Sequence, residues 1–196
     1  MKGFFSGKEV KGKKKQVTDP CEKCKLYEGV NSPKMAWSGE GKSECLIIAE
    51  APGKDEDAKG VQLIGAAGRL LRKELKNLDM DLDVDFWKTN SVICRPPKNR
   101  KPTKKELKLC KANLEKTIDE LNPRFIWLLG GTAVESFYMG RFSNLGINRW
   151  RKLCIPDEFT NAWVVPMFHP SYILRNKDEG LSAIFKRDLK KAVAWL

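Results

Sequence analysis

Two carboxylates lie close together in the chain, beside a turn that follows an apolar run. Residues 46–48 are Leu-Ile-Ile, and Glu50 and Glu56 flank a Pro-Gly pair directly after them. An apolar run that ends in such a turn predicts a buried strand followed by a loop. A carboxylate at a strand end can act as a general base or offset positive charge on a substrate. One of the two can instead serve only to hydrogen-bond the loop.

Two further polar residues follow apolar segments. His169 is the only histidine in the chain and comes directly after residues 163–168, whereas Asn90 lies in a segment of strand-like composition that begins at Phe86. An imidazole N–H can stabilise charge that develops on a leaving group, and an amide offers both a donor and an acceptor to a base edge. The alternative for both residues is structural, because a lone histidine or asparagine often only satisfies the backbone at the end of an element.

Four of the six cysteines have the spacing of metal ligands: Cys21, Cys24, Cys94 and Cys110. Cysteines that are kept reduced inside a cell favour metal binding over disulfides. One C-x2-C pair with two dispersed cysteines suits a [4Fe-4S] cluster better than a zinc ribbon, which would usually show a second such pair. Unrelated free thiols are the alternative. The other two, Cys45 and Cys154, are expected to be small buried hydrophobic residues.

The elements that must position these residues alternate between strand and helix. Helical periodicity follows Gly68, and a capping box formed by Thr103 and Glu106 precedes a second helix. Residues 130–132, Gly-Gly-Thr, are expected with Glu135 to cap a third. Strands are predicted at residues 46–49, 86–93, 125–129 and 163–168. This alternation predicts an α/β fold with a mostly parallel sheet and helices on both faces. Because ligands bind at the carboxyl ends of such strands, the residues above are expected to line one crevice.

Length and charge suggest how the chain is organised. A chain of 196 residues that is 41% hydrophobic predicts a single domain with a sizeable core. The formal charge is +12, of which +4 belongs to residues 1–19. We expect these residues to form a basic, flexible tail and residues 20–196 to form the domain. The remaining positive charge suits a polyanion such as nucleic acid, and a solvated basic surface is the simpler alternative.

No apolar stretch has the length of a signal peptide core or a membrane span. We therefore expect an intracellular protein of the cytoplasm or nucleoid, with no membrane partner and with reduced cysteines. The expected oligomeric state is a monomer.

These motifs together resemble the iron-sulfur, or family 4, uracil-DNA glycosylases. The resemblance runs from residue 21 to about residue 175. It is carried by Cys21-x2-Cys24, Glu50-Ala51-Pro52-Gly53-x2-Glu56-Asp57, residues 60–68, Thr89-Asn90, Cys94-Arg95-Pro96-Pro97-x-Asn99-Arg100 with Cys110, Leu129-Gly130 and His169-Pro170-Ser171-x2-Leu174-Arg175. It implies a three-layer αβα sandwich with a four-stranded sheet and a [4Fe-4S] cluster on Cys21, Cys24, Cys94 and Cys110. The implied activity is hydrolysis of the N-glycosidic bond of uracil in single- or double-stranded DNA, which leaves an abasic site.

The resemblance also assigns roles, in a reaction for which the nucleotide is flipped out of the stack. Asn90 would pair with N3–H and O4 of uracil, and His169 would donate to O2 as charge develops there. Glu50 or Glu56 would place the attacking water, and Ala51 would offer its backbone N–H to the base. Residues expected to contact DNA phosphates or to fill the gap left by the base are Arg95, Lys98, Arg100, Ser171, Ile173, Leu174 and Arg175.

One position departs from the family pattern. Where the family places a phenylalanine that stacks on uracil, this chain has Leu63 in the segment Gly60-Val61-Gln62-Leu63. Leucine can still cover the base, but it lacks an offset-stacking energy of about 0.5–1.5 kcal/mol, which predicts activity lower by roughly tenfold or less. Two other functions therefore stay open. They are a glycosylase for another deaminated base and a non-catalytic iron-sulfur DNA-binding module that works with replication proteins.

Overall fold

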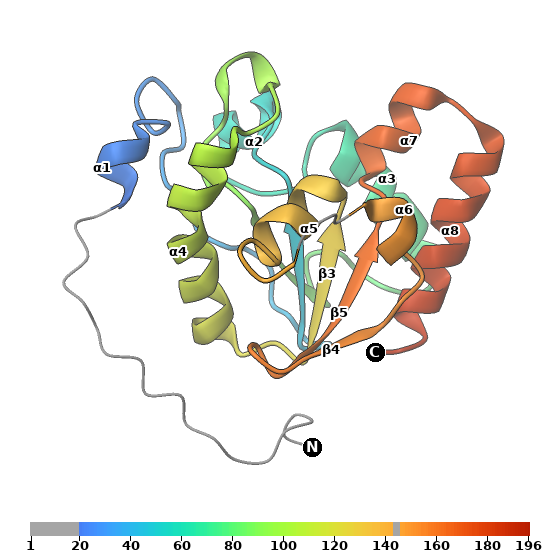
Figure 1. The fold of residues 1–196 in the computed structure, drawn as a ribbon. Coiled ribbons are helices and arrows are strands. Elements are labelled where there is room, and N and C mark those ends of the chain that lie inside the picture. The colour runs from blue at the N-terminus through green and yellow to red at the C-terminus, as the bar shows by residue number, and fades with distance from the viewer. Residues whose placement is uncertain (1–19, 143–145) are drawn as a thin grey trace.

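The computed structural model describes residues 20–142 and 146–196, so the predicted basic tail lies outside the described residues. The strands form one sheet in the order β2-β1-β3-β5-β4. Figure 1 labels β3, β5 and β4 of this sheet. Their bounds are Cys45–Ala49 (β1), Phe86–Asn90 (β2), Phe125–Leu129 (β3), Ile155–Asp157 (β4) and Ala162–Met167 (β5). Neighbours among β1, β2, β3 and β5 pair in parallel, and β4 pairs antiparallel with β5. The predicted mostly parallel sheet is confirmed.

The sheet has one strand more than the four that were predicted. β4 is only three residues long, contains Pro156 and lies at the edge of the sheet. Three residues are too few to show an alternating pattern, and proline is tolerated in a strand only at such an edge. The sequence therefore contains no usable signal for β4.

Helices cover both faces of the sheet, which confirms the three-layer sandwich. Side chains alternate along β1, so that Ile47 and Ala49 pack in the cluster that contains Leu71 of α3 and Leu189 of α8, whereas Ile48 faces the opposite layer. α3 (Ala66–Lys76), α7 (Pro170–Asn176) and α8 (Glu179–Val193) lie on the first face, and α4 (Lys104–Leu121) and α5 (Gly131–Phe137) lie on the second. The shorter helices are α1 (Pro20–Cys24), α2 (Lys54–Lys59), α6 (Ile147–Trp150) and the 3-10 turn Pro97–Asn99.

α4 begins as the sequence predicts. The Thr103 hydroxyl accepts the Glu106 backbone N–H at 3.2 Å, and the Glu106 carboxylate accepts the Thr103 N–H at 2.7 Å. This capping box satisfies two backbone donors that the first turn of a helix otherwise leaves unpaired. It also fixes the helix so that Leu107, Cys110 and Leu114 face inward.

The order of the strands determines where a ligand can bind. The chain passes from β1 to β2 on one side and then to β3 on the other side of β1. The helices that follow β1 and β3 therefore diverge, and a crevice opens at the carboxyl ends of these strands. No helix within residues 20–142 and 146–196 is long and apolar enough to cross a bilayer.

Candidate active site

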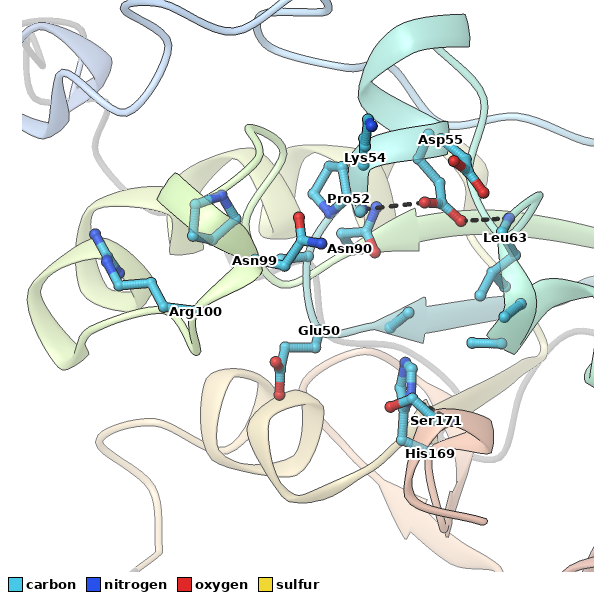
Figure 2. A pocket seen from close by; sticks show the side chains of 18 of the residues that line it. Glu50, Pro52, Lys54, Asp55, Leu63, Asn90, Asn99, Arg100, His169 and Ser171 are labelled. Atoms are coloured by element: carbon cyan, nitrogen blue, oxygen red, sulfur yellow. Dashed lines mark hydrogen bonds between the residues drawn. The ribbon is translucent and has the colours of Figure 1, made fainter. Parts of the chain in front are cut away.

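A pocket of about 370 Å³ opens at this carboxyl edge (Figure 2). Its walls come from the loops that follow β1, β2 and β5 and from the start of α3. Ala51 and Pro52 lie at the turn after β1 and form part of the pocket wall. Of the residues selected from the sequence, the pocket brings together Glu50, Ala51, Glu56, Leu63, Asn90, Arg100, His169, Ser171 and Arg175.

Glu50 directly follows β1, and one of its carboxylate oxygens is held. Its Oε2 accepts the Thr132 hydroxyl at 2.5 Å, and Thr132 is buried in the first turn of α5. No other described residue hydrogen-bonds this carboxylate, so Oε1 is available to a ligand in the pocket. The predicted cap of α5 within residues 130–132 is confirmed at Gly130, whereas the Thr132 hydroxyl bonds to Glu50 and does not cap the helix. The sequence shows that Thr132 follows the last residue of β3 by three positions, which places its hydroxyl near the expected crevice.

Glu56 has a different environment from Glu50. Its carboxylate accepts three backbone N–H groups, from Gly53 at 3.1 Å, Ile64 at 3.1 Å and Gly65 at 2.8 Å. Both oxygens are therefore occupied, and the side chain joins the turn after β1 to the loop before α3. This geometry is the loop-bonding alternative that the sequence left open for one of the two carboxylates.

The loop that contains Leu63 is held against α3. Leu63 has a positive φ of 55° and is buried, with its side chain between the pocket and the core. A Cβ on Gly68 would overlap the carbonyl oxygen of Leu63, so only glycine allows this approach. Gln62 is also buried, accepts the Ser38 hydroxyl at 2.5 Å and donates to the Ala36 carbonyl oxygen. Leu63 is therefore in a fixed position at the pocket wall.

The imidazole of His169 is held in one tautomer. Ser171 donates its backbone N–H to Nδ1 at 3.1 Å, so Nδ1 is an acceptor and the proton of the neutral ring lies on Nε2. Burial, and to a lesser extent the charge of Arg175, lower the pKa of His169 to about 4. A Cβ on Gly130 would lie 2.9 Å from the Cβ of His169, so glycine makes room for this residue. His169 is thus a neutral N–H donor at the pocket wall.

Asn90 is the last residue of β2 and is only 3% exposed. Its side-chain amide forms no hydrogen bond with any described residue, although it lines the pocket. The amide nitrogen and oxygen are open to the pocket and are not enclosed in the core. An unpartnered amide in a pocket wall therefore indicates a group that bonds to a ligand.

Some residues selected for DNA contact are buried, lie outside the pocket or bond within the protein. Ile173 as a wedge is wrong, because α7 turns its side chain into the core at 6% exposure, whereas the next residue, Leu174, is 40% exposed. Lys98 is exposed outside the pocket, and Arg95 bonds within the protein. Arg100 forms a two-pronged pair with Glu106 at 2.6 and 2.8 Å, which lowers the pKa of that carboxyl to about 2.

The four cysteines line a second, mostly apolar cavity where α1 packs against α4: Cys21, Cys24, Cys94 and Cys110. Lys34 donates its backbone N–H to the Cys94 sulfur at 3.2 Å, and Ile93 donates to the Cys110 sulfur at 3.4 Å. The Asn113 amide lies 3.7 Å from the sulfurs of both Cys21 and Cys110. Burial raises the pKa of Cys110 to about 11. In the described residues no group of three or more His, Cys, Asp or Glu is placed to hold a single metal ion.

The remaining two cysteines differ from each other. Cys45 is fully buried in β1, and burial raises the pKa of its thiol well above the ordinary value. Cys154 is half-buried and packs against the core on the face that α8 covers. Both lie outside the cavity of the other four.

Comparison with known proteins fits this site. The family model of the uracil-DNA glycosylase superfamily matches residues 37–196. The type-4 uracil-DNA glycosylase of Sulfurisphaera tokodaii is 35% identical over 183 residues, which cover 90% of this chain and 80% of the relative. That of Thermotoga maritima is 37% identical over 160 residues, 81% of each chain, and that of Archaeoglobus fulgidus is 30% identical over 182 residues, 87% of this chain and 85% of the relative. The chain therefore belongs to the uracil-DNA glycosylase superfamily and, within it, to the type-4 uracil-DNA glycosylases.

Proposed function

We propose that this protein hydrolyses the N-glycosidic bond of uracil in DNA and leaves an abasic site. One juxtaposition carries the proposal: a single pocket holds the unpartnered amide of Asn90, the neutral Nε2–H donor of His169 and a free carboxylate oxygen of Glu50. The type-4 relatives, which are named for this activity, support it. The three groups supply base recognition, leaving-group stabilisation and water activation.

The Asn90 amide distinguishes uracil from cytosine. Its oxygen accepts N3–H of uracil and its N–H donates to O4 once the nucleotide has been flipped into the pocket. Cytosine presents the opposite pattern, an acceptor at N3 and a donor at N4, so donors would face donors. A buried polar group left without its partner costs about 1–3 kcal/mol, and this penalty disfavours cytosine.

His169 acts on the leaving base. When the bond between C1′ and N1 breaks, its electron pair stays with uracil and charge accumulates on O2. The Nε2–H of His169 donates to O2 and bonds more strongly as that charge grows, so the transition state gains more than the ground state. The neutral ring needs no proton from solvent to do this at pH 7.

Glu50 acts on the sugar and on the water. The Thr132 hydroxyl fixes one carboxylate oxygen, and the other accepts a proton from the attacking water as the water oxygen bonds to C1′. The carboxylate also offsets the positive charge that the sugar develops. Glu56 takes no part in this step, because three backbone N–H groups occupy its carboxylate.

The second cavity fits an iron-sulfur cluster by its donor chemistry. Four thiols face one mostly apolar space, and backbone N–H groups point at two of the sulfurs, as is typical of thiolates that ligate iron. We propose that a [4Fe-4S] cluster is bound by Cys21, Cys24, Cys94 and Cys110. Such a cluster would cross-link α1, the loop after β2 and α4, and it would contribute no group to bond cleavage.

Base release from defined oligonucleotides tests the proposal. Anaerobically purified protein is incubated with single- and double-stranded oligonucleotides that carry one uracil, one hypoxanthine or, as the control, one cytosine. We expect abasic sites only where uracil was present. Faster release of hypoxanthine would indicate a glycosylase for another deaminated base. Binding of all three oligonucleotides without any release would indicate a non-catalytic DNA-binding module.

A further inference from the structure

The loop that follows Cys94 has a strained backbone at the pocket mouth. Lys98 and Asn99 both have positive φ values, 54° and 55°, although neither is a glycine. Two consecutive residues in this region are costly and persist only where the surrounding structure holds them. The hydrogen bonds and the ion pair that hold this loop therefore keep Lys98 and Asn99 in this conformation.

A buried carboxylate holds the loop from inside. Asp57 of α2 is 2% exposed and accepts the Ser32 backbone N–H at 3.0 Å and the Asn31 amide at 3.3 Å. The guanidinium of Arg95 lies 3.7 Å from the same carboxylate, and its Nε donates to Oδ1 of Asn99 at 2.7 Å. A continuous path, Asp57 to Arg95 to Asn99, thus runs from α2 to the pocket mouth.

This path leaves one donor of Asn99 free in the pocket. Because Oδ1 accepts from Arg95, the amide N–H2 of Asn99 is the group that remains, and no described residue accepts from it. Figure 2 shows Asn99 and Arg100 on the side of the pocket away from His169 and Ser171. A fixed N–H2 donor at this edge matches a phosphate oxygen beside the flipped nucleotide.

We propose that Asn99 contacts the sugar-phosphate backbone of the substrate and that Asp57 and Arg95 are positioning residues for it. The proposal rests on the proposed function for the identity of the ligand. Holding the donor in place before binding lowers the ordering cost of association. The contacted oxygen takes no part in bond cleavage, so the interaction is equally strong in the ground state and the transition state. It therefore lowers KM and leaves kcat unchanged.

The chain offers a matched control pair. Asp157 and Arg141 also form a buried carboxylate–guanidinium pair, with side-chain exposures of 2% and 20%, against 2% for Asp57 and 24% for Arg95. Asp157 ends β4, outside the residues that line the pocket. Substitution at Asp157 removes a comparable pair and so measures the effect of lost stability alone.

The test compares kcat and KM for the single-uracil oligonucleotide. Variants are Asp57→Asn, Arg95→Gln, Asn99→Ala, the double variant Asp57→Asn with Asn99→Ala, and Asp157→Asn. We expect the first three each to raise KM about tenfold with kcat within about twofold of wild type. The double variant should be no worse than Asn99→Ala, because both changes remove one contact. Asp157→Asn should lower the melting temperature and leave KM unchanged.

Two results would overturn the proposal: a KM for Arg95→Gln and Asn99→Ala equal to that of Asp157→Asn, or additive effects in the double variant. Arg95 and Asn99 are not core residues, so their variants test the proposal even if Asp57→Asn fails to fold. If wild type releases no uracil, the proposed function fails separately. The dissociation constant for an oligonucleotide with a tetrahydrofuran abasic site, measured by fluorescence anisotropy, then gives the same comparison among the variants.

Discussion

The base pocket and the four-cysteine cavity are neighbours, yet their polar groups are satisfied in opposite ways. In the pocket, the Asn90 amide and one carboxylate oxygen of Glu50 have no hydrogen-bond partner among the described residues. In the cysteine cavity, N–H groups of the protein point at the sulfurs of Cys21, Cys94 and Cys110. Unpaired groups are available to a substrate, whereas groups already bonded hold a structure in place. The difference assigns chemistry to the pocket and rigidity to the cysteine cavity.

The two carboxylates of the pocket give the largest expected effect. Glu50→Gln should lower kcat by about 10²–10⁴, because the water loses its general base. Glu56→Gln, which keeps the shape of the side chain, should mainly lower the free energy of unfolding, by about 1–3 kcal/mol, since it weakens the hydrogen bonds from three part-buried backbone N–H groups. Single-turnover rates and thermal melts of both variants separate the two roles. A larger loss of kcat in Glu56→Gln than in Glu50→Gln would reverse the assignment.

Substitution of one cysteine should affect the four-cysteine cavity and leave the pocket intact. Cys110→Ala is expected to lose iron and to melt earlier, by about 2–4 °C for each kcal/mol of binding energy lost. The uracil-release rate per folded molecule should stay within about tenfold of wild type. Cys154→Ala is the matched control, because this thiol lies outside the cavity, and it should retain iron. Iron content, melting temperature and rate are measured on the same preparations.

Substitution of Arg175 tests how a neighbouring positive charge affects the pKa of His169. The pKa of His169 is lowered to about 4, mainly by burial and partly by Arg175, so the ring is neutral above about pH 5. Below that range, protonation of Nδ1 breaks its bond with the Ser171 N–H, and kcat should fall. Arg175→Gln removes a positive charge, so the pKa of His169 should rise while staying below its ordinary value. The ratio of variant to wild-type kcat across pH 4–8 measures this shift in the pKa of His169.

Leu63 gives the smallest expected effect. Leu63→Phe should raise kcat/KM by about twofold to tenfold, through a stacking energy of about 0.5–1.5 kcal/mol on the flipped base. Leu70→Phe is a control at a partly buried residue outside the pocket lining. An unchanged kcat/KM in Leu63→Phe would show that the leucine already covers the base as well as an aromatic ring does.

Much of this arrangement was predictable from the sequence. β1 and β3 are apolar runs that the core buries completely, and the capping box at Thr103 fixed the phase of α4 and hence of Cys110. The predictions that failed or stayed open concern contacts between residues that are distant in the chain. Nothing near Glu50 or Glu56 in the sequence shows which one meets Thr132, 82 positions away from Glu50. The error at Ile173 came from the unknown phase of the short helix α7.

Uracil release by His169→Ala is the most direct test of the division between the two regions. Single-turnover rates are measured for wild type and variant with matched iron content, and binding to the abasic-site oligonucleotide is measured in parallel. We expect the rate to fall by about 10²–10³, the effect of losing one preorganised donor to a developing anion, with DNA affinity and iron content unchanged. A rate within about threefold of wild type would contradict the role of the pocket in leaving-group stabilisation.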